Sequence, residues 1–183
     1  MTDIKIENVS KKIKSNMILK NIDMELTSGH IYGFRGKNGC GKTMLMRCIC
    51  GLIIPTEGKI IINGKELHKD IKIPESIGAL IENPAFLPQY TGFKNLKMLA
   101  SLKGKISDEE VKLAIKRAGL DPDDKRTYKK YSLGMKQKLG IANAIMGEPD
   151  IIVLDEPINA LDEISVENVK NVFLELKEKG KLI

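Results

Sequence analysis

The feature that most constrains this chain is a segment with three glycines, Gly36 to Thr43, which reads GKNGCGKT. It fits the spacing G-x-x-x-x-G-K-[ST]. His30 to Phe34 before it is typical of a short strand, and Gly41 to Gly51 after it of a helix with Leu45 and Ile49 on one face. A strand, a glycine-rich turn and a helix in this order gather backbone N–H groups around an anion. The segment therefore predicts a phosphate-binding loop.

Each residue type in this loop has a physical reason. Glycines let the backbone curl so that successive N–H groups converge on phosphate oxygens. Lys42 adds a full positive charge near the terminal phosphates, and the hydroxyl of Thr43 can ligate Mg²⁺. Cys40 stands at a helix N-terminus, which favours a reactive thiol that a bound nucleotide would protect, although it can equally fill a small-residue position. The expected nucleotide contacts are Gly36, Asn38, Gly39, Cys40, Gly41, Lys42, Thr43 and Met44.

Two carboxylates follow a buried strand further along the chain. Asp150 to Leu154 is rich in β-branched residues, and Asp155 and Glu156 come directly after it. Ligands of open α/β sheets bind at the carboxyl ends of strands. We therefore expect Asp155 to hold the Mg²⁺ shell, while Glu156 accepts a proton from an attacking water.

The remaining pattern alternates strands with helices. The capping box of Ser107 and Glu110 marks the start of one helix, whereas residues 74 to 92 contain prolines that break regular structure. Such alternation favours α/β layering around a mostly parallel sheet, with an antiparallel pair near the N-terminus. Further strands are expected at 4–9, 18–26, 59–62 and from 181, and helices at 93–102, 108–118, 134–146 and 163–179.

Two further motifs resemble those of a known family. Tyr131 to Gln137 (YSLGMKQ) resembles the L-S-G-G-Q signature of ABC-transporter ATP-binding subunits, and Asp155 to Asp162 (DEPINALD) resembles the carboxylate motif and the loop after it. The resemblance covers essentially the whole chain. It implies a P-loop NTPase (RecA-like) core at about 1–82 and 131–183, an N-terminal antiparallel β layer, and a helical subdomain at about 83–130.

The resemblance also implies a mechanism. Two cassettes close head to tail around two ATP molecules as a homodimer, so that Ser132 and Gly134 of each touch the γ-phosphate bound by the other. A separate membrane-spanning permease subunit would carry the substrate. Ser132 is equally compatible with a plain helix N-cap. Leu133 and Met135 depart from the signature, Met44 replaces the second hydroxyl residue, and Ile13 stands where an adenine-stacking aromatic is expected.

The most informative departure is Glu82, which stands where most such cassettes have Gln. A carboxylate can still ligate Mg²⁺, so we expect Glu82 to be both a metal ligand and a catalytic residue. It adds negative charge that, on the sequence alone, the metal or Lys42 must offset. Glu82 and the signature variant resemble the bacitracin-export and lantibiotic-immunity branch, which exports peptide antibiotics. Another substrate remains the alternative.

Charge and composition bound the partners and the location. The net charge is +6, and a basic group lies at 125–138. Because only Tyr128 and Tyr131 accompany it, a solvated face or an acidic partner is favoured over nucleic acid, and no nucleic acid is expected. Three cysteines suit a reducing compartment. No run approaches the roughly 20 apolar residues of a membrane span. We expect a peripheral protein on the cytoplasmic face of a bacterial membrane.

The resemblance further places a switch histidine beyond Ile183, and His30 and His68 are not positioned to replace it. We therefore expect nucleotide binding with impaired hydrolysis. Three hypotheses remain: an ATPase subunit of a peptide exporter, an ABC ATPase of the repair or translation kind, and a binding-only module. Repair types carry long heptad arms and translation types two cassettes, and neither pattern occurs in this sequence.

Overall fold

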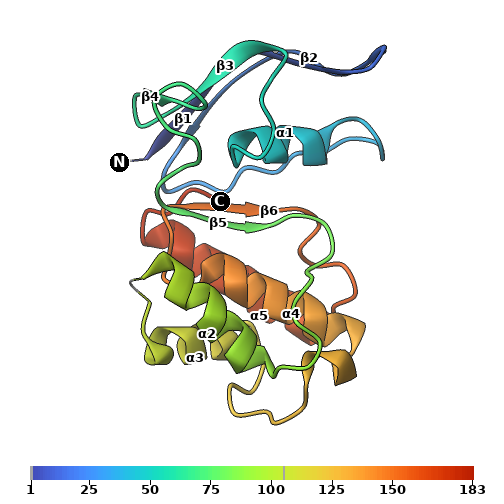
Figure 1. Cartoon of the computed structure of the whole chain (residues 1–183), viewed down its shortest axis with the longest axis vertical. Coiled ribbons are helices and arrows are strands. Elements are labelled where there is room, and N and C mark those ends of the chain that lie inside the picture. The colour runs from blue at the N-terminus through green and yellow to red at the C-terminus, as the bar shows by residue number, and fades with distance from the viewer. Residues whose placement is uncertain (1, 105) are drawn as a thin grey trace.

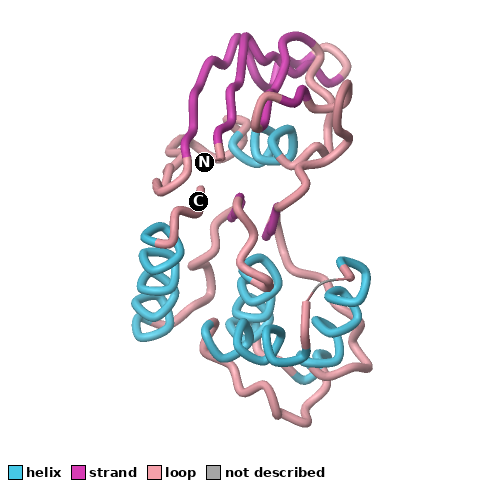
Figure 2. Tube along the Cα trace, turned by 90° about the vertical axis from the view of Figure 1, so that its left-hand side faces the viewer, coloured by secondary structure: helices cyan, strands magenta, loops and turns pink. Residues whose placement is uncertain are grey.

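The computed structural model describes residues 2–104 and 106–183, arranged in three tiers (Figure 1). An antiparallel sheet lies at one end with α1 (Lys42–Ile49) against it. Two short parallel strands form the middle tier, and the remaining helices form the other end (Figure 2). The predicted combination of an antiparallel layer, an α/β core and a helical part is therefore confirmed.

The antiparallel sheet has the strand order β2-β1-β3-β4. Alternating apolar residues drive it: Ile4 and Ile6 are buried and pair with the apolar residues of both neighbouring strands, as in Ile4 opposite Leu26 and Ile62. The expected pair is thus part of a four-stranded sheet. Its strands are β1 (Asp3–Ile13), β2 (Asn16–Thr27), β3 (Glu57–Ile62) and β4 (Lys65–Glu66).

The parallel sheet consists of β5 (Ile77–Leu80) and β6 (Ile151–Leu154), paired in register. A single parallel bridge joins Leu182 to Ile151, where a strand was expected to begin. The parallel part is smaller than the sequence predicts. The expectation that residues 74 to 92 lack regular structure was wrong at β5, because four residues between the prolines suffice for a strand.

The strand predicted at His30 to Phe34 was also wrong. Tyr32 N–H donates to the carbonyl of Ile183 (2.8 Å), and Ile183 N–H donates to the carbonyl of His30 (3.1 Å). A cavity lies between residues 31–34 and β6. Within the described ranges, residues 30–34 therefore have backbone contacts with Ile183 but no strand pairing with β6. The apolar pattern alone could not reveal that β6 is too far away to pair.

The helices begin where the sequence predicts, because their N-caps are present. Ser107 accepts from Glu110 N–H and the Glu110 side chain returns to the Ser107 backbone, which confirms the capping box. Thr91, Ser132 and Asp162 cap the other three, each with a side-chain oxygen that accepts one backbone N–H. These helices are α2 (Gly92–Lys103), α3 (Asp108–Arg117), α4 (Leu133–Ile145) and α5 (Glu163–Glu178), with a short 3₁₀ turn at Tyr128–Lys130.

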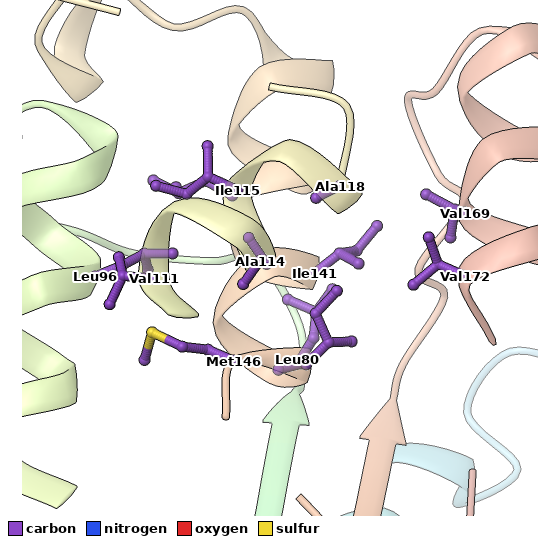
Figure 3. Close-up of a cluster of buried hydrophobic side chains, with 14 of the residues drawn as sticks. Leu80, Leu96, Val111, Ala114, Ile115, Ala118, Ile141, Met146, Val169 and Val172 are labelled. Carbon is purple, nitrogen blue, oxygen red and sulfur yellow. The ribbon is translucent and has the colours of Figure 1, made fainter. Parts of the chain in front are cut away.

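The helices share one hydrophobic core with the middle tier. Leu80 of β5, Val111 of α3 and Ile141 of α4 meet there, and Val169 and Val172 face them from α5 (Figure 3). The boundary proposed near residues 83 and 131 stays a prediction, because α2 and α3 pack on the same core as α4 and α5. No helix within residues 2–104 and 106–183 combines the length and apolarity needed to cross a bilayer.

Candidate functional site

The glycine-rich loop leads directly into α1. Gly39 and Gly41 have φ of 80° and 98°, a left-handed conformation that costs glycine little. A Cβ on Gly41 would lie 2.8 Å from the carbonyl oxygen of Ile18 on β2, so this glycine is required by space as well as by backbone angle. The loop therefore passes beneath the antiparallel sheet and aims the N-terminus of α1 toward the end of β6.

Lys42 is folded back into its own loop. Its Nζ donates to the carbonyl oxygens of Gly36 (2.9 Å) and Lys37 (3.2 Å). An ammonium group held by two neutral carbonyls can exchange them for anionic oxygens, because charge-assisted hydrogen bonds are the stronger kind. The loop is therefore arranged so that an incoming phosphate group would take the place of its own carbonyls.

Thr43 and Asp155 are 112 residues apart in sequence and in direct contact. The Thr43 hydroxyl donates to Asp155 Oδ2 at 2.6 Å, and Asp155 is buried, with 9% of its surface exposed. The first turn of α1 thus meets the carboxyl end of β6, as the two motifs predict. A hydroxyl and a carboxylate side by side are oxygen ligands of the kind that Mg²⁺ takes.

A polar cavity of about 280 Å³ opens beside this pair. No group of three His, Cys, Asp or Glu side chains among residues 2–104 and 106–183 is arranged to hold a metal alone. A Mg²⁺ ion at Thr43 and Asp155 would therefore complete its coordination with oxygens of water and of a bound phosphate, as Mg²⁺ sites in proteins usually do. The lining residues are Thr43, Glu82, Asn83, Gln137, Asp155, Glu156 and Asn159.

Glu156 is held in place from two sides. Asn159 Nδ2 donates to Glu156 Oε2 at 2.6 Å, and Gln137 Nε2 donates to the carbonyl oxygens of Glu156 (3.2 Å) and Pro157 (3.1 Å). Glu156 also has φ of 47°, which is uncommon for a side chain of this kind. Gln137 is buried on α4, so the signature helix fixes the backbone of the carboxylate motif.

Glu82 leaves β5 with φ of 59° and forms an ion pair with Arg47. Arg47 Nη2 lies 2.6 Å from Glu82 Oε1. The expectation that only the metal or Lys42 could offset the charge of Glu82 was wrong. Arg47 stands one helical turn beyond Thr43, and its arm reaches the carboxylate from outside the polar cavity.

A larger cavity of about 390 Å³ shares Asp155 and Glu156 with the polar one. Ile31 to Phe34, β6 and Ile183 give it mainly apolar walls, and Lys42 also lines it. Apolar walls do not satisfy a triphosphate, whereas the smaller cavity offers hydroxyl, amide and carboxylate groups. The smaller cavity is therefore the better candidate for the metal and the terminal phosphate.

Comparisons with known proteins agree with this geometry. The family described as "ABC transporter" matches residues 19–159. The chain belongs to the ABC transporter family. It is 49% identical over 180 residues to an uncharacterized ABC transporter ATP-binding protein, YybJ, of Bacillus subtilis, covering 98% of this chain and 83% of that protein.

Relatives with more specific names also match. The bacitracin transport ATP-binding protein BcrA of Enterococcus faecalis is 37% identical, over 97% of this chain and 58% of that protein. The lantibiotic transport ATP-binding protein SrtF of Streptococcus pyogenes is 34% identical, over 98% of this chain and 77% of that protein. This cassette therefore spans little more than half the length of BcrA.

The solved cassette MJ0796, in a dimeric post-hydrolysis state with ADP and Pi, superposes with a TM-score of 0.88 at 25% identity. The alignment covers 97% of this chain and 84% of that one. The fold is therefore that of an ABC ATPase cassette, a P-loop NTPase.

Ser132 and Gly134 of the signature lie apart from both cavities, whereas Gln137 at its end lines the polar one. Ser132 Oγ accepts from Met135 N–H at 3.2 Å as an N-cap, and Leu133 beside it is 67% exposed. A Cβ on Gly134 would approach the Ala160 carbonyl to 2.8 Å. Neither Ser132 nor Gly134 lines the cavities at Thr43 and Asp155.

The other expected nucleotide contacts stay on the loop and its helix. Cys40 and Asn38 are exposed, and Met44 is partly buried against the hydrophobic core between the antiparallel sheet and α1. The Cys40 sulfur packs over Gly36, where a Cβ would come within 2.5 Å of it.

Three residues near the site of the cassette were not assigned a role from sequence: Arg47, Gln137 and Asn159. Arg47 was detectable, because residues four apart on a helix share a face and Thr43 was already placed. Gln137 and Asn159 lie within motifs that the sequence revealed, but their contacts with Glu156 depend on how α4 packs against the turn after β6. That packing is a tertiary feature without a local signal.

Proposed function

We propose that this chain binds MgATP at the Gly36–Thr43 loop and couples its binding and hydrolysis to export of a peptide antibiotic. The main support is the 2.6 Å hydrogen bond from Thr43 to Asp155. Thr43 directly follows the loop lysine, Lys42, whose ammonium group is held by carbonyl oxygens that a phosphate could replace. The export would run through a separate permease, with the cassette on the cytoplasmic face of a bacterial membrane.

The residues would divide the work by charge. The loop N–H groups and Lys42 would bind the phosphates, Thr43 and Asp155 would hold the Mg²⁺, and Glu82 would offer a further oxygen ligand from the end of β5. Bound Mg²⁺ supplies positive charge at the phosphate oxygens. Glu156, fixed by Asn159, accepts the proton of a water at the terminal phosphate. Asn38, Gly39, Cys40, Gly41 and Met44 complete the loop contacts.

A second copy of the cassette would complete each site. Ser132 and Gly134 line neither cavity of their own chain, so they are available to the nucleotide held by another copy. The dimeric state of MJ0796 with ADP and Pi supports this arrangement. The names of BcrA and SrtF support a bacitracin-type or lantibiotic-type substrate.

Calorimetric titration with ATP and Mg²⁺ tests the binding half. We expect uptake by the wild type, a loss of roughly 100-fold or more in Lys42→Ala, and a clear loss in Asp155→Asn when Mg²⁺ is present. Lys65→Gln on β4 is the control for a lost lysine. Absence of uptake by folded wild-type protein would refute the proposal.

Bacteria that carry the complete transporter test the export half. Glu156→Gln should abolish peptide resistance while nucleotide uptake persists. Retained resistance in this variant would favour a binding-only role, and resistance to unrelated compounds alone would favour another substrate.

A further inference from the structure

The ion pair of Arg47 and Glu82 stands at the edge of the proposed metal site. Glu82 lines the polar cavity together with Thr43 and Asp155, while Arg47 reaches it from the side of α1. Glu82 Oε1 is the atom that pairs with Arg47 Nη2, at 2.6 Å. Oε1 of the carboxylate is thus bound to Arg47, which leaves Oε2 free to bind the proposed Mg²⁺.

The walls of the polar cavity carry an imbalance of charge. Glu82, Asp155 and Glu156 are carboxylates, and none of the seven described residues that line the cavity is a cation. A triphosphate would bring further negative charge to the same place. Two like charges a few ångströms apart repel by several kcal/mol in a partly dry site, so a compensating charge has a large effect there.

Arg47 supplies that charge without entering the cavity. Thr43 and Arg47 lie four residues apart on α1 and share a face, so a ligand held by Thr43 lies on the Arg47 side of the helix. The guanidinium remains charged at any physiological pH. Its side chain is 32% exposed, against 60% for Glu82, so Arg47 is the less exposed partner of the pair.

We propose that Arg47 is a positioning residue that makes Glu82 compatible with a bound triphosphate. It holds Oε1, aims the carboxylate at the metal side of the cavity, and cancels the charge that would otherwise repel the γ-phosphate. The inference rests on the proposed binding of MgATP and adds the residue that allows a carboxylate, instead of an amide, at position 82.

The ion pair of Arg47 and Glu82 should contribute little to the stability of the fold. Exposed ion pairs contribute little to stability, and both side chains are accessible to water. A variant at Arg47 should therefore fold normally and show its effect only when a ligand with a terminal phosphate is present. The opposite role, in which Arg47 keeps Glu82 away from the metal, predicts tighter binding once Arg47 is removed.

Calorimetry with a magnesium complex of a non-hydrolysable ATP analogue, and with MgADP, tests the proposal. We expect Arg47→Gln to bind the triphosphate roughly tenfold more weakly and MgADP within about threefold of wild type. Arg47→Lys, which keeps the charge, should restore most of the triphosphate affinity. Lys65→Gln breaks a surface ion pair of the same 2.6 Å length and should change neither.

A double-mutant cycle supplies the decisive comparison. In Glu82→Gln, which has no charge to cancel, Arg47→Gln should weaken triphosphate binding by less than about threefold. Equal losses with and without Glu82, equal losses for both nucleotides, tighter binding in Arg47→Gln, or its failure to fold would each overturn the inference. Wild-type protein that binds neither nucleotide would refute the proposed function itself.

Discussion

The chain is tightly packed where α4 crosses β5 and open where the glycine loop faces the cavities. A Cβ on Gly78 of β5 would lie 1.7 Å from the Ala144 carbonyl, and one on Gly140 of α4 would lie 2.8 Å from Leu80. By contrast, a Cβ on Gly39 or Gly33 would meet nothing within 4 Å. Glycine thus serves close packing at Gly78 and Gly140 and leaves free space at Gly33 and Gly39.

The difference shows how work is divided within the cassette. The packed region fixes the carboxyl ends of β5 and β6, from which Glu82 and Asp155 extend. The open region keeps polar groups on exchangeable partners, as Lys42 is kept on two carbonyls. Changes in the first region should therefore affect stability, and changes in the second should affect ligand binding.

The largest expected effect comes from Gly78→Ala. A methyl group cannot fit against the backbone of α4, so we expect a loss of about 3 kcal/mol or more in the free energy of unfolding, or no folded protein. Gly33→Ala, which adds the same methyl to the open region, should change it by less than about 1 kcal/mol. Urea unfolding of both variants measures the contrast, and equal losses would erase it.

A smaller loss of stability is expected from Arg117→Met, at the contact between α3 and α5. Arg117 of α3 is 13% exposed and pairs with Glu148 (2.8 Å) before β6 and with Glu175 (3.1 Å) on α5. Its loss should cost roughly 2 kcal/mol, because two carboxylates lose a largely desolvated partner. Nucleotide affinity should remain at the wild-type value. A large loss of affinity would show that the two regions are coupled.

Acid should weaken the same cluster slightly. Hydrogen bonding from Lys179 is the main cause that lowers the pKa of Glu148, and it also lowers the pKa of Glu175. A depressed carboxyl pKa stabilises the fold above the unfolded value near 4.3, and this gain is lost as pH falls through the folded pKa. Because both groups are over a third exposed, the change should stay below about 1 kcal/mol.

The acid effect is read from urea unfolding between pH 6 and 3. Lys179→Gln should lose less stability over this range than the wild type, because it removes the main cause of both lowered pKa values. An identical pH dependence in both proteins would contradict the assignment.

The smallest effect on stability is expected in the open region, at Cys40. Cys40 is exposed, whereas burial raises the pKa of Cys48 and raises that of Cys50 to about 12. A maleimide should therefore label Cys40 first, and MgATP should slow the labelling. Cys40→Ser should change stability by less than about 0.5 kcal/mol. Labelling that MgATP does not slow would place Cys40 outside the nucleotide contact.

Sequence reasoning succeeded where the signal was local. The glycine loop, the capping box at Ser107 and the carboxylates after β6 can each be recognised from a few consecutive residues. The structure brings Thr43 and Asp155 together as expected. It failed at His30 to Phe34, because an apolar stretch does not reveal whether a neighbouring strand is in reach. It also missed the charge partner of Glu82. The spacing from Thr43 could have placed Arg47 on the right face of α1, but which carboxylate it meets depends on where β5 ends relative to α1.

The most direct test of the account is a crystal structure of the chain with Mg²⁺ and a non-hydrolysable ATP analogue. We expect Lys42 Nζ to leave the carbonyls of Gly36 and Lys37 for phosphate oxygens, and the direct contact of Thr43 with Asp155 to open around the metal. A nucleotide seated elsewhere, with Lys42 still bonded to its own loop, would contradict it.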